Sequence, residues 1–264
     1  MRLRTIFLSA ALATTALLCA AEGPASNSSP SSTSKTEASL SAADLELRGD
    51  VFRSQNDIDE AQRYYGLALK KNPKNAKVWN KLGVMALRSR EYPAAQTNFM
   101  QAIKYDKHFA EAVNNLGVLY YFKKDFVHAE AQYRKAIQLA DTASFHSNLG
   151  ALYFETNDPK LAIEQYRIAI QMDPLVLERS SPSGVSAHAG TAVERGRYAF
   201  LMTRLYAKLG DVDHALTHLR TALQNGYKPP QDFMTDEDFV AMRQDPRFPE
   251  VMSTPEAAAE PVTQ

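Results

Sequence analysis

The chain has 264 residues, enough for one or two domains with a sizeable core. Its 30 Lys and Arg residues balance its 30 Asp and Glu residues, and this zero net charge argues against a cationic nucleic-acid-binding protein. We therefore expect no nucleic-acid partner. Cysteine occurs once, at Cys19, which excludes an intrachain disulfide framework and cysteine-rich zinc sites.

Residues 1–21 follow the order of a secretory signal peptide. Arg2 and Arg4 supply a basic start, an apolar stretch covers residues 6–18, and small residues follow. The stretch is too short for a comfortable transmembrane helix of about 20 residues. Cleavage after Ala21 would fit the small residues there, so we expect an exported protein, periplasmic or secreted.

Two alternatives stay open for this segment. Cys19 is a candidate lipidated N-terminus of a bacterial lipoprotein, although the preceding Leu18 is large for that role. An uncleaved segment would instead act as an anchor, and membrane attachment is expected only in these two cases. Residues 22–41 are dominated by Ser, Thr, Pro and Ala and offer little to bury, so they are predicted to form a disordered linker.

A period of about 34 residues governs the middle of the chain, and a period in this range marks a repeat architecture. Four columns keep the period over four copies. They are a glycine (Gly49, Gly83, Gly117, Gly150), an alanine (Ala61, Ala95, Ala129, Ala162), a large ring (Tyr65, Phe99, Tyr133, Tyr166) and a second alanine (Ala68, Ala102, Ala136, Ala169).

Each copy divides into two helical windows. In the second copy one apolar stripe has a spacing near 3.6 residues, a break follows at residues 91–93, and a second stripe begins. A glycine inside a helix costs roughly 1 kcal/mol relative to alanine, so its recurrence implies a compensating gain in packing. We expect Gly83 and Ala95 to let the two helices approach closely, with the ring of Phe99 filling the space beside them.

At these residues the chain resembles the tetratricopeptide repeat family. The second copy has Trp79-x-x-Leu82-Gly83 of the family pattern, the third has Leu116-Gly117-x-x-Tyr120, and the fourth has Leu149-Gly150-x-x-Tyr153 and ends at Pro174. The resemblance implies an all-α fold with four repeats over residues 42–176. Helix-turn-helix repeats would stack into a solenoid, a right-handed superhelix, with a concave groove.

The pattern changes after the fourth copy. Residues 177–195 are predicted to be an insertion loop, and residues 196–229 a degenerate fifth repeat with Thr203 in place of the glycine. Residues 230–252 are expected to form a C-terminal helical cap. In that cap an acidic start precedes a short helix with Phe239, Val240 and Met242, and Phe248, Val251 and Met252 are available to cover the open end of the stack. Residues 253–264 are predicted to be a disordered tail.

The first helix of each copy has a second face. Its second, fifth, sixth, ninth and thirteenth positions point away from the packing stripe, and the resemblance implies that they line the concave groove. The candidate peptide-binding residues there and beside it are Lys77, Asn80, Lys81, Arg88, Asn114, Asn115, Tyr121, Asn148 and Phe154.

Asparagine pairs with both donors and acceptors of an extended peptide backbone, and Asn115 and Asn148 occupy equivalent positions. The alternative is that these asparagines are solvated polar residues on an exposed face. For Tyr121, Phe122 and Phe154 the alternative to apolar pockets is ordinary packing between repeats. A full basic clamp for a C-terminal carboxylate is not expected, because the first copy offers Glu46 and Asp50 on this face.

No motif for a cofactor or for catalysis is found. His214 and His218 lie four residues apart on a predicted helix without a third ligand beside them, so no metal site is expected. His188, Ser183 and Ser186 lack the surroundings of a hydrolase nucleophile. We expect a non-catalytic scaffold that holds a protein or peptide in envelope assembly or secretion. The alternative is an accessory protein of the cell envelope that binds a glycan or small ligand, and the sequence does not predict the oligomeric state.

Overall fold

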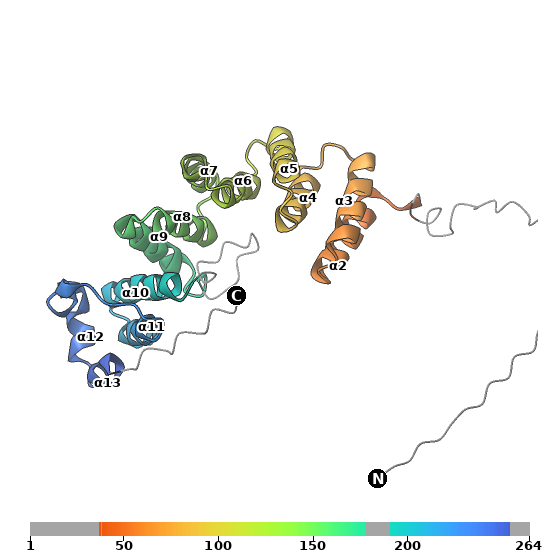
Figure 1. Ribbon diagram of the computed structural model, residues 1–264. Coiled ribbons are helices and arrows are strands. Elements are labelled where there is room, and N and C mark those ends of the chain that lie inside the picture. Colours follow the sequence, from red (N-terminus) through yellow and green to blue (C-terminus); the bar gives the residue numbers. More distant parts are fainter. Residues whose placement is uncertain (1–36, 38, 178–190, 254–264) are drawn as a thin grey trace, which may run out of the picture. The chain divides into compact units, whose positions relative to one another are not determined.

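The computed structural model describes residue 37, residues 39–177 and residues 191–253 (Figure 1). The chain divides into two units at residue 39, and everything below concerns the second unit, which begins at Leu40. The predicted signal peptide (1–21), nearly all of the linker (22–41), the centre of the insertion (178–190) and the tail from residue 254 lie outside the described residues.

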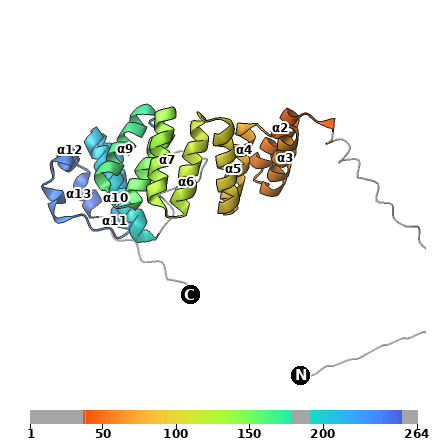
Figure 2. The same cartoon turned by 90° about the horizontal axis from the view of Figure 1, so that it is seen from above.

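The described residues form helices in consecutive packed pairs, and no strand is found among them. The first four pairs follow one another in chain order (Figures 1 and 2): α2 (Ala42–Ser54) with α3 (Ile58–Lys71), α4 (Ala76–Arg88) with α5 (Tyr92–Tyr105), α6 (Ala110–Phe122) with α7 (Phe126–Leu139), and α8 (Ala143–Glu155) with α9 (Pro159–Met172). The prediction of an all-α repeat solenoid is confirmed. None of the described helices is long and apolar enough to span a membrane.

The glycine column is explained by the packing within each pair. A Cβ atom added at Gly49, Gly83, Gly117 or Gly150 would lie 2.5, 2.6, 2.8 or 3.0 Å from the ring of Tyr65, Phe99, Tyr133 or Tyr166, respectively. These four rings are almost completely buried. The two helices of a pair therefore approach as closely as the sequence predicts, and the ring occupies the space that the missing side chain leaves.

The turn inside each pair also repeats. Asn56, Arg90, Lys124 and Asn157 have positive φ angles of 59°, 60°, 59° and 61°, the left-handed conformation that ends the first helix. An aspartate follows in three of the four turns, and Asp57, Asp125 and Asp158 each accept a hydrogen bond from the backbone of the second helix. The turn therefore stops one helix and caps the next within two residues.

A fifth pair is formed by α10 (Ala192–Leu209) and α11 (Val212–Gln224). The helix α10 begins four residues earlier than the predicted fifth repeat, so residues 192–195 are helical and do not belong to a loop. The reason is a capping box, in which the Thr191 side chain accepts from the Glu194 backbone while the Glu194 carboxylate accepts from the Thr191 backbone. Thr203 is fully buried and donates to the Ala199 carbonyl at 3.0 Å.

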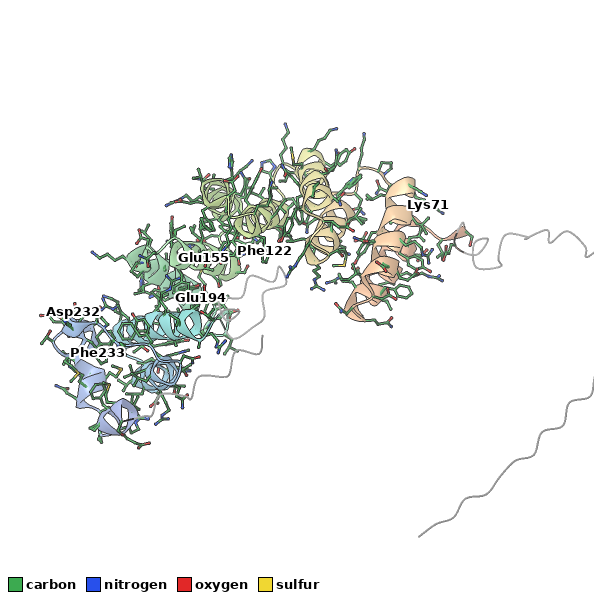
Figure 3. The ribbon with its side chains drawn as sticks, viewed as in Figure 1. Lys71, Phe122, Glu155, Glu194, Asp232 and Phe233 are labelled. Carbon is green, nitrogen blue, oxygen red and sulfur yellow. The ribbon has the colours of Figure 1, made fainter. Side chains whose placement is uncertain are left out.

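The direction of α10 is reversed relative to the earlier first helices. In the stack, Lys124, just after α6, pairs with Glu155 at the end of α8, so α6 and α8 run the same way. By contrast, Phe154 near the end of α8 contacts Tyr198 near the start of α10, with ring centroids 5.4 Å apart. The charge of Lys124 also acts on Glu194 in the first turn of α10, so the start of α10 lies near the end of α6, and Figure 3 labels Glu194 on the side of Phe122 and Glu155.

The long connection between α9 and α10 permits this reversal. Short connections, such as residues 72–75 and 106–109, place consecutive helices antiparallel. A chain that returns along the 14-residue helix α9 must cover roughly 21 Å before the next helix starts in the same direction. Residues 173–191 supply that length, which the earlier connections lack.

The predicted C-terminal cap is present. It consists of η1 (Gln231–Met234), η2 (Glu237–Phe239), α12 (Val240–Gln244) and α13 (Phe248–Met252). Its buried residues continue the core that starts in α4, namely Phe233, Phe239, Met242, Phe248 and Val251. Met252 was expected to help cover the open end but is 37% exposed, because the short helix α13 turns that position to solvent.

Candidate functional site

The candidate groove residues lie at three different depths. Lys77 and Arg88 on α4 are exposed, and Asn80, Lys81 and Tyr121 are half-buried. The other four candidates are buried, with exposed fractions between 3% and 9%: Asn114, Asn115, Asn148 and Phe154. We call the surface that carries Lys77, Asn80, Arg88, Tyr121 and Phe122 the first-helix face.

The buried asparagines form a hydrogen-bonded ladder. Asn148 Nδ2 donates to Asn114 Oδ1 at 2.9 Å, and Asn115 Nδ2 donates to Asn80 Oδ1 at 3.0 Å. Asn114 Nδ2 links the two bonds by a longer contact of 3.4 Å to Asn115 Oδ1. The ladder crosses α4, α6 and α8, so these asparagines hold repeats together and are not solvated residues on an exposed face.

The same pairing of helix positions occurs at three successive joints, where a joint is the contact between the first helices of two neighbouring repeats. The fifth position of one first helix bonds to the sixth position of the next, as Asn80 does with Asn115 and Asn114 does with Asn148. At the first joint Glu46 holds the fifth position and Lys81 the sixth, at 2.7 Å. The corresponding pair at the fourth joint would be Ser147 and Leu201, which cannot form such a bond, and there α10 is reversed.

Lys81 is engaged inside the protein. Its ammonium group lies 2.7 Å from both Glu46 and Asp50, and the Tyr65 hydroxyl donates to Asp50 at 2.8 Å. Burial works against ionisation of Asp50, but the bonds from Lys81 and Tyr65 outweigh it and hold the pKa of that carboxyl below its usual range. Lys81 therefore offers little free charge to a ligand, in contrast to Lys77 and Arg88.

Aromatic side chains stand beside the ladder on α6. The Tyr121 ring packs 6.0 Å from Phe122 and 6.0 Å from Phe126, measured between ring centroids. Burial, helped by the charge of Glu155, raises the pKa of Tyr121 to about 12. Phe122 is 38% exposed, so an apolar surface remains on this part of the first-helix face.

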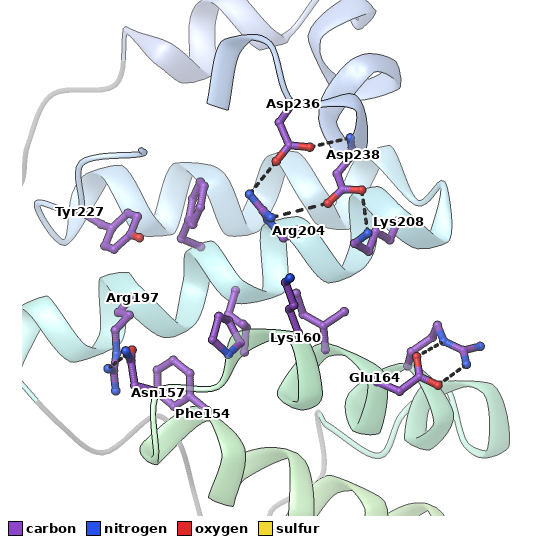
Figure 4. Close-up of a pocket in the computed structure, with 15 residues that line it drawn as sticks. Phe154, Asn157, Lys160, Glu164, Arg197, Arg204, Lys208, Tyr227, Asp236 and Asp238 are labelled. Carbon is purple, nitrogen blue, oxygen red and sulfur yellow. Dashed lines mark hydrogen bonds and ion pairs between the residues drawn. The ribbon is translucent and has the colours of Figure 1, made fainter. Parts of the chain in front are cut away.

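Phe154 belongs to a separate cavity. This cavity, about 660 Å³ in volume, lies between α9 and α10 and is bordered by Asp236 and Asp238 of the cap (Figure 4). Its apolar wall consists of Phe154, Ile163, Phe200, Leu201 and Tyr227. Sequence reasoning missed it because it depends on the reversal of α10, which the repeat columns do not reveal.

The two histidines of α11 pack against an aromatic ring. His214 and His218 stack on Tyr206 with centroid distances of 4.8 and 5.3 Å, and His214 Nδ1 lies 2.7 Å from Asp211. Within the described residues no group of three or more His, Cys, Asp or Glu side chains is placed to hold a metal ion. His188 lies outside the described residues.

Comparison with known proteins identifies the repeats. Models of the tetratricopeptide repeat match residues 46–95, 86–144 and 143–174, and the chain belongs to the tetratricopeptide repeat family. The matches end where the regular stack ends, before the reversed pair. This family is generally a non-catalytic protein-interaction fold, so the chain belongs to the class of protein-interaction scaffolds.

A solved structure supports the same fold. The structure described as pilF of Pseudomonas aeruginosa is similar with a TM-score of 0.52 and 19% identity, over 74% of this chain and 80% of that one. The MamA protein has a TM-score of 0.47 and 22% identity, over 74% of this chain and 95% of its own. At these identities the likeness shows the fold alone. No match was found among curated proteins.

Proposed function

We propose that the protein is a non-catalytic scaffold that holds an extended polypeptide on the first-helix face. The observation that supports this proposal is that different positions of α4 and α6 have different roles. The fifth and sixth positions tie the repeats together, and Lys77, Arg88 and Phe122 remain exposed. Cations on α4 beside an apolar surface on α6 suit a segment with acidic residues next to an apolar one.

The ends of the asparagine ladder add hydrogen-bonding capacity. Within the described residues, Asn80 Nδ2 donates to no partner, and Asn148 Oδ1 accepts from none. An extended backbone carries both a carbonyl acceptor and an amide donor, which would complement these two groups. The half-buried Asn80 is the more accessible end and lies on the same helix as Lys77 and Arg88.

Site-specific crosslinking in the native compartment tests the proposal. A photoreactive residue replaces Arg88 in one variant and Lys135, exposed on α7, in a matched control. We expect a polypeptide captured from position 88 and absent at position 135. Lys77→Glu with Arg88→Glu should then lower the affinity for that polypeptide at least about tenfold, with a strong dependence on salt, whereas Lys135→Glu should not. Equal capture at both positions, or an unchanged affinity, would contradict the proposal.

Substitution of the buried asparagines is a poorer test. Asn115→Ala with Asn148→Ala would be the natural choice if these side chains were exposed groove residues. Both side chains are buried and bonded to other repeats, so removing them also weakens the stack. The exposed Lys77 and Arg88 separate binding from folding.

The setting that we propose is the cell envelope, in assembly or secretion, for an exported periplasmic or secreted protein. The support is the signal-like order of residues 1–21. Intact-mass analysis of the exported protein tests it. A mature chain that begins at Glu22 would support cleavage after Ala21, and a lipid on Cys19 would instead support a membrane-anchored lipoprotein. A chain that retains Met1 in the cytoplasm would refute export.

A further inference from the structure

The cavity between α9 and α10 carries an excess of positive charge. Figure 4 shows its two long walls, with Lys160 and Glu164 on α9 and Arg197, Arg204 and Lys208 on α10. Five of its lining side chains are cationic and three are anionic, so the lining has a net charge of +2. A cavity of about 660 Å³ is within the range of roughly 300–1,000 Å³ in which proteins bind small molecules.

Three of the cations are neutralised by the cavity's own acids. Arg204 lies 2.7 Å from Asp236, and Lys208 lies 2.7 Å from Asp238. Arg167 pairs with Glu164 at 2.7 Å. These pairs fix one end of the cavity and leave no acid of the lining for the remaining two cations.

Arg197 and Lys160 form no ion pair with the lining acids, although the charge of Arg197 adds to the Thr191 hydrogen bonds that lower the pKa of Glu194 one turn earlier on α10. Among the described residues no carboxylate lies within ion-pair distance of either, and the Arg197 guanidinium donates only a long bond of 3.5 Å to Asn157 Oδ1. Its Nε is buried without any hydrogen-bond partner. A buried donor without an acceptor typically costs about 1–3 kcal/mol, and a guanidinium is best satisfied by a planar carboxylate.

The position of Arg197 is set by apolar contacts. Its guanidinium carbon lies 4.3 Å from the centroid of the Phe154 ring, and Phe154 packs against Tyr198. Stacking of this kind holds the plane of the guanidinium and leaves its edge for an anion. Burial raises the pKa of the nearby Tyr227, and the charges of Arg197 and Arg204 oppose that rise, as expected for cations that converge on one space.

We infer that this cavity binds a small organic acid, a carboxylate carried on an aromatic or branched aliphatic group, with the carboxylate at Arg197 and with Lys160 adding positive charge further along the cavity. The apolar group would lie against Phe154, Ile163, Phe200 and Tyr227. The site is separate from the first-helix face and goes beyond the proposed polypeptide scaffold. It also gives a physical basis to small-ligand binding, which the sequence left as an alternative.

Calorimetry with the full chain and a matched pair of probes tests the inference. Hydrocinnamate and hydrocinnamamide have the same apolar body and differ in the charge of the head group. We expect the acid to bind at least about tenfold more tightly than the amide, because only the acid forms charge-assisted bonds with Arg197. Equal affinity of the two probes, or no heat from the acid at millimolar concentration, would overturn the inference.

Two variants and a control locate the head group. Arg197→Met keeps the aliphatic stem over Phe154 and should reduce acid binding to the level of the amide. Lys160→Met should lower the affinity for the acid only about two- to threefold, because Lys160 is exposed and its charge is screened by solvent. Lys107→Met, at an exposed position between α5 and α6, should change nothing. Far-UV circular dichroism verifies that each variant is folded, and a folded Arg197→Met variant that still prefers the acid would refute the assignment.

Discussion

The regular stack from α2 to α9 and the C-terminal pair α10–α11 are built from the same kind of helix but joined by different rules. In the stack, the first helices run in one direction and polar bonds connect the fifth position to the sixth at each joint. At the last joint those positions hold Ser147 and Leu201, α10 runs the other way, and aromatic contacts such as Phe154 with Tyr198 replace the polar bonds. The polar match between fifth and sixth positions therefore accompanies the parallel stacking of first helices, and it is absent at the joint where the direction reverses.

The largest expected effect breaks the ladder. Asn114→Ala removes the acceptor of Asn148 and a partner of Asn115, both buried, and should lower the free energy of unfolding by about 2–4 kcal/mol. Ser147→Ala is the matched control, at the same position of the next repeat and without a side-chain bond within the described residues. Urea denaturation measures both. Equal, small losses would show that the ladder is dispensable to the stack.

The glycine column gives the next largest effect. Gly83→Ala places a Cβ 2.6 Å from the Phe99 ring and should destabilise the protein by about 1–3 kcal/mol. Gly66→Ala, within α3 and with no atom within 4 Å of the added Cβ, should instead stabilise it by roughly 0.5–1 kcal/mol. Opposite shifts in thermal midpoint are expected, and shifts of the same sign would refute the packing explanation.

The residue with a positive φ angle between two paired helices differs between the two regions, and its substitution should change stability by a smaller amount. Gly210 in the last pair and Arg90 in the stack have φ angles of 76° and 60° at the same place between two helices. Gly210→Ala should cost about 1 kcal/mol because the left-handed conformation is unfavourable for alanine. Arg90→Gly should raise the free energy of unfolding by less than about 1 kcal/mol, since glycine also increases the entropy of the unfolded chain. Chemical denaturation of both variants provides the comparison.

The smallest effect concerns acid stability at the first joint. The folded pKa of Asp50 lies below its ordinary 3.8, so its contribution is fully present above about pH 5 and is lost as the pH falls through the folded value. The thermal midpoints of the natural protein and Asp50→Asn should therefore differ at neutral pH and converge in acid. Asp59→Asn, at an exposed position on α3, should show no such convergence. A difference that is constant down to pH 2 would contradict the coupling to Lys81.

The sequence predicted the repeats because their determinants are local and periodic. Gly83, Ala95 and Phe99 each act within one pair, so their spacing alone indicates the packing. The depth of Asn114, Asn115 and Asn148 could not be derived from one helix, since burial depends on the neighbouring repeat. The match of fifth and sixth positions across repeats was nevertheless present in the sequence, as Glu46 with Lys81 and Asn80 with Asn115.

The last pair was only partly predictable. Tyr206, Ala215 and Leu219 fit the repeat columns and indicated a helix pair, but columns within a pair carry no information about its direction relative to the preceding one. The capping box at Thr191 and Glu194 was a local signal for the true start of α10. The cavity and the role of Arg197 follow from the reversal, so they needed the structure.

The reversed α10 also limits how such a protein can change in length. The copy α6–α7 carries asparagine at both the fifth and the sixth position, so its duplication or loss would leave an asparagine pair at each joint around it. No copy can be added after α9 in that way, because the surface there is already committed to a helix of opposite direction and a closing cap. Growth of the array on the C-terminal side of α9 is therefore blocked, and α10 to α13 terminate the stack.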